Sequence, residues 1–134
     1  MMKNVVQPGD KRQHRYTVTE ADKAAFASGT VHEVCSTFAL AREMEWSSRL
    51  FVLDMLEEGE EGIGTRLEIR HLSPALPGEE LLFVATVHEW QAGELLCDVE
   101  VYAGKRLVAK GLTGQKILTK EKLTALFNKL KNNG

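Results

Sequence analysis

Residues 37–58 contain neither glycine nor proline, and this stretch constrains the fold more than any other. Leu, Met, Ala, Glu and Arg are frequent in it, and these residues favour helix. A broad apolar face runs along the stretch and consists of Leu40, Ala41, Met44, Leu50, Phe51, Val52, Met55 and Leu56. The pattern therefore predicts a helix about 33 Å long. Such a helix has to cross the whole of a 134-residue molecule.

The segments that follow this helix have the pattern of long strands. Residues 63–73 alternate strictly between their two faces, and three further strand-like segments cover residues 81–90, 95–102 and 106–118. Short turns that contain glycine separate the last three segments. This spacing predicts a meander of antiparallel strands.

The two ends of the chain carry shorter patterns. Residues 1–11 are polar, contain Pro and Gly, and are expected to form a loose leader. We expect a strand over 12–20, a short helix over 21–28 and a connecting stretch over 29–36. Residues 119–134 are expected to form a short amphipathic C-terminal helix.

One helix cannot cover both faces of a sheet, so a meander of this length has to curve around the helix to bury its apolar stripe. The predicted fold is therefore α+β, a hotdog fold in which a curved antiparallel sheet wraps a long central helix. We expect one such domain over residues 1–134. The open edge of a sheet of this kind usually meets the same edge of a second copy, which removes an exposed strand.

Composition argues against several classes of function. The 17 basic and 19 acidic side chains give a net charge of −2, which creates no general attraction to nucleic acid or to an anionic membrane. No apolar run approaches the roughly 20 residues of a membrane span. The first eight residues lack the apolar core of a signal peptide, so we expect a cytoplasmic protein with Cys35 and Cys97 as reduced thiols. His32 and Cys35 lack a second pair of ligands at zinc-finger spacing, so no metal site is expected.

His71 lies where the strand pattern predicts an apolar side chain. It continues a face that includes Thr65, Leu67 and Ile69, which is expected to turn toward the helix. A packed, hydrogen-bonded histidine is one interpretation of this position. The functional interpretation is a general base, because imidazole titrates near neutral pH.

Glu45 lies in the middle of the predicted helix, at the edge of its apolar stripe. A solvated glutamate that pairs with Arg42 or Arg49 at helical spacing would explain it. The functional interpretation is a carboxylate that orients a base, holds a water molecule or attacks a carbonyl group.

Thr37 follows Ser36 at the expected start of the helix. Its hydroxyl can cap the helix, or it can act as a nucleophile or substrate anchor at the positive end of the helix dipole. Gly64, near the start of the strand that carries His71, can be a plain turn glycine or can present its N–H to a carbonyl oxygen. Thr37 and Glu45 are about 12 Å apart along an ideal helix, so a site that uses both has to be extended.

Several motifs together carry a family resemblance. They are Val34-Cys35-Ser36-Thr37, Met44-Glu45, the run from Gly62 to Leu72, Pro77-Gly78, and the closing stretch from Val101 to Gly111. In this combination the chain resembles the hotdog-fold acyl-CoA thioesterases, and most closely the fluoroacetyl-CoA thioesterase type, over roughly residues 15–118. It departs from many relatives at the helix start, where it has Phe38 in place of a proline.

The resemblance implies that Thr37, Glu45 and His71 form a catalytic set and that Gly64 takes part in recognition of the carbonyl group. It also implies a homodimer with active sites at or near the subunit interface, and the pairing of dimers into tetramers stays open. No metal or redox cofactor is implied, and coenzyme A enters as part of an acyl-CoA substrate. The expected activity is hydrolysis of a small or medium acyl-CoA. A non-catalytic acyl-CoA-binding or sensing module is the alternative, and a hotdog hydratase is a third.

Overall fold

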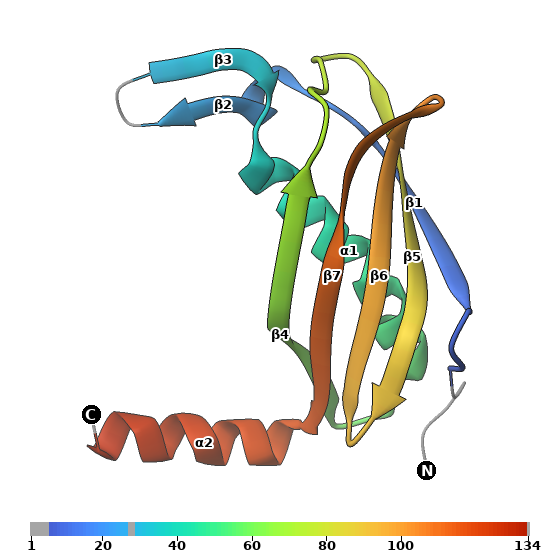
Figure 1. Cartoon of the computed structure of the whole chain (residues 1–134). Helices are drawn as coiled ribbons and strands as arrows, with labels where there is room; N and C mark the ends of the chain where they lie inside the picture. The colour runs from blue at the N-terminus through green and yellow to red at the C-terminus, as the bar shows by residue number, and fades with distance from the viewer. Residues whose placement is uncertain (1–5, 27–28, 134) are drawn as a thin grey trace.

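The structure, a computed structural model, describes residues 6–26 and 29–133. One long helix, α1 (Thr37–Met55), lies across a five-stranded antiparallel sheet (Figure 1). The strands of this sheet are β1 (Lys11–Thr17), β4 (Glu60–His71), β5 (Glu80–Gln91), β6 (Glu94–Ala103) and β7 (Arg106–Thr119). Their order is β1-β5-β6-β7-β4, so β1 and β4 form the two edges. The predicted arrangement, a long central helix wrapped by a curved antiparallel sheet, is confirmed.

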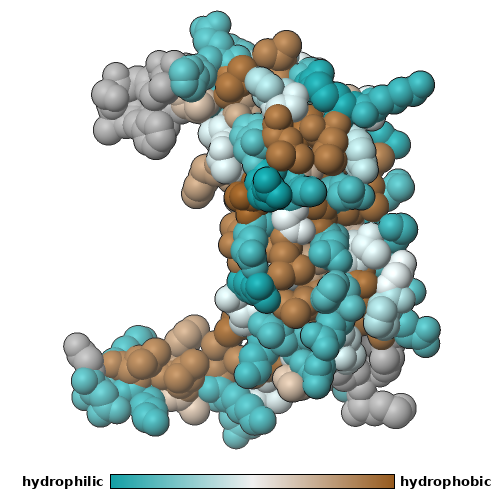
Figure 2. All heavy atoms as spheres, viewed as in Figure 1, coloured by the Kyte–Doolittle hydropathy of each residue, from teal (hydrophilic) through white to brown (hydrophobic). Residues whose placement is uncertain are grey.

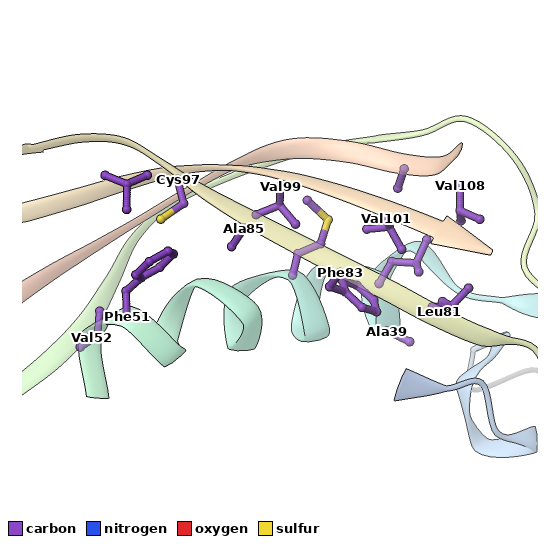
Figure 3. Packing of buried hydrophobic residues seen from close by; sticks show 14 of the residues in the cluster. Ala39, Phe51, Val52, Leu81, Phe83, Ala85, Cys97, Val99, Val101 and Val108 are labelled. Atoms are coloured by element: carbon purple, nitrogen blue, oxygen red, sulfur yellow. The ribbon is translucent and has the colours of Figure 1, made fainter. Parts of the chain in front are cut away.

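The core fills the space between α1 and the sheet (Figure 3). Helix residues such as Phe51 and Met44 and strand residues such as Phe83 are completely buried. Close packing of these side chains fixes the height and direction of α1 over the strands. The core thereby determines which helix residues come to lie over the β4 edge.

Helix α1 ends at Met55, three residues before the predicted end. Leu56 is extended, and Glu57 and Glu60 form a turn in which Glu60 N–H donates to Glu57 O. Gly59 lies in this turn with φ +82°, a conformation that favours glycine. The turn leads directly into β4, which begins at Glu60.

The predictions of a short helix over 21–28 and of a plain connection over 29–36 are wrong for the described residues. A single 3₁₀ turn, Glu20–Asp22, is followed by β2 (Lys23–Phe26), which pairs with β3 (Gly29–Cys35). Residues 27 and 28 lie outside the described part. A helix of eight residues is marginal on its own, whereas the antiparallel pairing with β3 satisfies backbone groups of both segments.

The predicted loose leader lies partly outside the described residues, which begin at Val6. Val6 is buried, Gly9 N–H donates to Val87 O, and Val87 N–H donates to Asp10 O. Residues 6–11 are therefore held against β5 instead of being loose.

Helix α2 (Lys120–Asn133) confirms the predicted C-terminal helix. It and the β2–β3 ladder both project beyond the β4 edge, from opposite ends of the sheet (Figure 1). The space-filling view shows the hollow between these two projections (Figure 2). Leu123 is buried, but Leu126, Phe127 and Leu130 are 44%, 50% and 59% exposed. The apolar stripe of α2 is therefore largely uncovered on the side of the molecule where the sheet is open.

Candidate active site

Thr37 and His71 meet at the N-terminal end of α1. Thr37 Oγ1 lies 3.0 Å from His71 Nδ1. Ser36 caps the helix, because its Oγ accepts the Ala39 N–H at 3.0 Å. The interpretation of Thr37 as the N-cap is therefore wrong, and its hydroxyl contacts the imidazole at the positive end of the helix dipole.

His71 is the last residue of β4 and is half-buried. Its Nε2 is enclosed and has no hydrogen-bond partner among the described residues. Leaving such a group without a partner costs about 1–3 kcal/mol, so a role beyond packing is favoured. A shallow cavity of about 280 Å³ adjoins this histidine and is lined by Val34, Leu72, Ser73 and Pro74.

Glu45 lies two turns beyond Thr37, over the edge strand. Gly64 is its nearest neighbour on β4: a Cβ at Gly64 would stand 3.0 Å from Glu45 Oε1. Both residues are exposed, so a ligand can reach them. Arg42 bonds to Asp22 and Glu43, and Arg49 bonds to the Gly62 carbonyl, so the expected pairing of Glu45 with either arginine is not formed.

A bulge lets β4 present both of its site residues to α1. The β4–β7 register shifts between Gly64 and Arg66, and Thr65 turns to the outer face, where its hydroxyl donates to Glu94. In an uninterrupted strand, residues 64 and 71 would face opposite sides, because they are an odd number of residues apart. The expectation that Thr65 shares the His71 face is wrong for the same reason.

The four predicted site residues form two pairs within one chain. Thr37 contacts His71, and Glu45 adjoins Gly64. The pairs are about 12 Å apart along α1 and about 20 Å apart along β4. The structure therefore does not gather all four residues around one point of a single chain.

A polar network that the sequence patterns do not reveal fixes the start of α1. Asp22 Oδ2 accepts the Tyr16 hydroxyl at 2.6 Å, and Arg42 donates to Asp22 Oδ1 at 3.2 Å. Burial opposes ionisation of Asp22, but hydrogen bonds from Tyr16, Thr19 and Arg42 outweigh burial and lower its pKa. The network joins β1, the 3₁₀ turn and α1, so it holds the helix end that carries Thr37.

Neither cysteine is suited to nucleophilic chemistry. Cys35 and Cys97 are free and buried. Burial raises the pKa of the Cys35 thiol to about 11 and that of the Cys97 thiol to about 12. Both thiols therefore stay protonated at neutral pH and cannot serve as the attacking group.

A hollow of about 840 Å³ lies on the outer face of the sheet. Its lining includes charged groups of both signs, among them Arg66, Arg70, Asp98 and Lys110. None of the four predicted site residues lines it. We therefore place the candidate chemistry on the α1 face instead.

Within residues 6–26 and 29–133, no three His, Cys, Asp or Glu side chains are grouped so that they could hold a metal ion. None of the helices in this described part is both long and apolar enough to cross a membrane.

Comparisons with known proteins agree with the observed fold. Residues 18–121 match the fluoroacetyl-CoA-specific thioesterase family. A hypothetical protein of Thermus thermophilus, a thioesterase superfamily member, is 36% identical, with a TM-score of 0.91 over 97% of this chain and 96% of that one. None of the curated proteins searched is significantly similar.

More distant structures share the fold. A structure of the fluoroacetyl-CoA thioesterase is 20% identical, with a TM-score of 0.86 over 94% of this chain and 98% of that one. A hot-dog-like protein from Thermanaerovibrio acidaminovorans is 22% identical, with a TM-score of 0.83 over 91% of this chain and 90% of that one. The predicted hotdog fold is thereby confirmed.

Proposed function

This chain belongs to the fluoroacetyl-CoA-specific thioesterase family, and on that premise we propose that it hydrolyses an acyl-CoA to coenzyme A and a small or medium carboxylic acid. The observation that supports the proposal most is the 3.0 Å contact between Thr37 Oγ1 and His71 Nδ1. A hydroxyl within hydrogen-bond reach of an imidazole is the arrangement of an activated nucleophile. The fluorinated acyl group of the family name is not part of the proposal.

His71 acts as the base in the proposed reaction. Its Nδ1 takes the proton of Thr37 Oγ1, or of a water molecule held there, and the oxygen attacks the carbonyl carbon of the thioester. The carbon–sulfur bond breaks, and the departing thiolate of coenzyme A takes the proton from the imidazolium. Where Thr37 is the nucleophile, water then hydrolyses the acyl ester by the same route and frees the acid. The reaction as written uses no metal or redox group.

Glu45 and Gly64 have supporting roles. The Gly64 N–H steadies the carbonyl oxygen on which negative charge develops. The Glu45 carboxylate orients His71 or activates the water molecule. The 3.0 Å spacing between Glu45 Oε1 and the Cβ position of Gly64 supports a shared location for these two roles.

These roles fit one thioester only when two copies of the chain contribute. In the proposed reaction His71 promotes attack on the carbonyl carbon and Gly64 binds the carbonyl oxygen, and these two atoms are bonded to each other. Within one chain, however, Gly64 and His71 are about 20 Å apart along β4. Strand β4 is an open edge, and two copies that pair through it about a two-fold axis run antiparallel. That pairing moves His71 of one copy toward Gly64 of the second copy. The proposed unit is therefore a cytoplasmic homodimer with two composite sites.

Uncovered apolar side chains on β4 and on other elements support this dimer. Phe38 is 78% exposed, and several other large apolar residues of α1, β4, the loop after it and α2 are exposed. They are Trp46, Leu53, Leu67, Leu72, Leu126, Phe127 and Leu130. Large apolar side chains that are exposed on β4 and on α2, which projects beyond the β4 edge, mark an interaction surface.

Release of coenzyme A, followed with a thiol reagent across a panel of acyl-CoA substrates, tests the proposal. We expect turnover by the wild type and a loss of about 100-fold or more in His71→Ala, the range for removal of a general base. His88→Ala is the matched control, because His88 lies on the outer face and bonds to Asp98. Saturable acyl-CoA binding without product, unchanged by His71→Ala, would instead establish a binding module.

A further inference from the structure

Three polar side chains lie in the otherwise apolar layer between α1 and β7. Ser48, Thr113 and Gln115 are each only 1% exposed. Buried polar groups are costly unless they are hydrogen-bonded. The hydrogen-bond partners of these three side chains therefore indicate their role.

The bonds of these side chains converge on one backbone atom, the carbonyl oxygen of Glu45. Ser48 Oγ donates to it at 3.0 Å, and Gln115 Nε2 donates to it at 3.1 Å. Thr113 Oγ1 donates to Ser48 Oγ at 2.8 Å, and Gln115 Nε2 also lies 3.1 Å from Ser48 Oγ. The helix turn that carries Glu45 is thus tied to β7 by side chains of two β7 residues.

Gln115 is also the direct partner of Gly64 in the β4–β7 pairing. Gly64 leaves room for the Glu45 carboxylate, and Gln115 holds the Glu45 carbonyl. Two paired residues on adjacent strands therefore contact opposite ends of the same glutamate.

The orientation of the Gln115 amide follows from its partner. A carbonyl oxygen can only accept, so the NH₂ group has to face Glu45 O. This leaves Gln115 Oε1 buried and without a partner among the described residues. An unpaired buried acceptor costs about 1–3 kcal/mol, so the amide is poorly explained by stability alone.

We propose that Ser48, Thr113 and Gln115 are positioning residues that hold the Glu45 carboxylate over Gly64. The inference rests on the proposed function, because it assigns the network to the same thioester site. None of the three side chains is assigned a contact with the substrate. They act on the reaction through Glu45.

The test compares Gln115→Met, Ser48→Ala and Thr113→Val with Ser47→Ala. Ser47 is a matched control, since it is also fully buried and donates to a carbonyl three residues earlier, that of Met44, at 2.6 Å. We expect kcat to fall about 10-fold or more in Gln115→Met, with KM within about 2-fold and a melting temperature no lower than that of Ser47→Ala. Thr113→Val keeps the shape of the side chain but removes its hydroxyl, so this variant replaces Gln115→Met in the test if Gln115→Met does not fold.

A double-mutant cycle separates positioning from a purely structural role. In a Glu45→Gln background, Gln115→Met is expected to cause no further loss of kcat, because its effect passes through Glu45. Additive losses of kcat in the double mutant would overturn the inference. Equal kcat values for Ser48→Ala and Ser47→Ala would overturn it as well. In both cases, turnover by the wild type would leave the proposed function intact.

A crystal structure of Gln115→Met gives a readout that does not depend on turnover. We expect the Glu45 carboxylate to move away from Gly64. A carboxylate that stays in place would overturn the positioning role, whereas a wild type without turnover would refute the proposed function.

Discussion

Gly64→Ala is expected to lower catalytic activity without lowering the stability of the fold. The added Cβ would stand 3.0 Å from Glu45 Oε1, closer than ordinary contact, so the carboxylate has to move by a few tenths of an ångström or more. Folding tolerates this, because the carboxylate is the exposed end of a flexible side chain. Replacing glycine by alanine in a strand also favours the folded state by about 0.5–1 kcal/mol.

Catalysis does not tolerate the same shift. A misplacement of about 1 Å costs up to about 100-fold in rate, so kcat is expected to fall 10- to 100-fold, about 1.4–2.7 kcal/mol. The backbone N–H of residue 64 is retained, so the variant tests the position of Glu45 and not the loss of a donor. The assay is coenzyme A release at saturating substrate, with unfolding followed by circular dichroism.

Gly111→Ala provides the contrast. Its Cβ would overlap the backbone carbonyl oxygen of Glu68, so we expect it to destabilise the fold by about 1–3 kcal/mol. Unchanged kcat in Gly64→Ala, at unchanged stability, would refute the assignment of Glu45 and Gly64 to the site.

Three further results are expected. Cys35 and Cys97 should react with a thiol reagent only after unfolding, because both are buried and protonated, and rapid reaction of the native protein would contradict this. Asp22→Asn should lower the free energy of unfolding by about 1–3 kcal/mol above about pH 5. Because folding lowers the pKa of Asp22, this difference should shrink as the pH falls below about 4, and urea titrations in which it stays constant would refute the assignment. Phe127→Glu should shift the mass measured by light scattering from dimer toward monomer, whereas Lys129→Glu should not.

Hydrophobic periodicity was sufficient to predict α1, the five main strands except for their exact ends, and α2. It failed at residues 21–36, where local helix signals compete with the pairing of two short strands. Such pairing is a contact between segments, and the composition of either segment alone does not reveal it.

The sequence suggests the four candidate site residues but does not predict how the fold arranges them. Strict alternation places Gly64 and His71 on opposite faces, and the bulge that brings them to one face leaves no signal in the pattern of the strand. Strict alternation does place Thr113 and Gln115 on one face of residues 106–118 together with Leu107 and Ala109, and polar residues on such a face are a signal for a buried network. Their common partner is a backbone carbonyl of α1, and only the packing of helix on sheet reveals it.

Subunit complementation tests the composite site most directly. His71→Ala and Glu45→Ala are each expected to be nearly inactive, and they are unfolded and refolded together so that mixed dimers form. In a mixed dimer, one site combines the intact His71 of one copy with the intact Glu45 of the second copy. About half of the dimers are mixed, each with one complete site, so activity should recover to about a quarter of the wild-type value. If each chain supplies a whole site by itself, the mixture will be no more active than the separate variants, which would contradict the account.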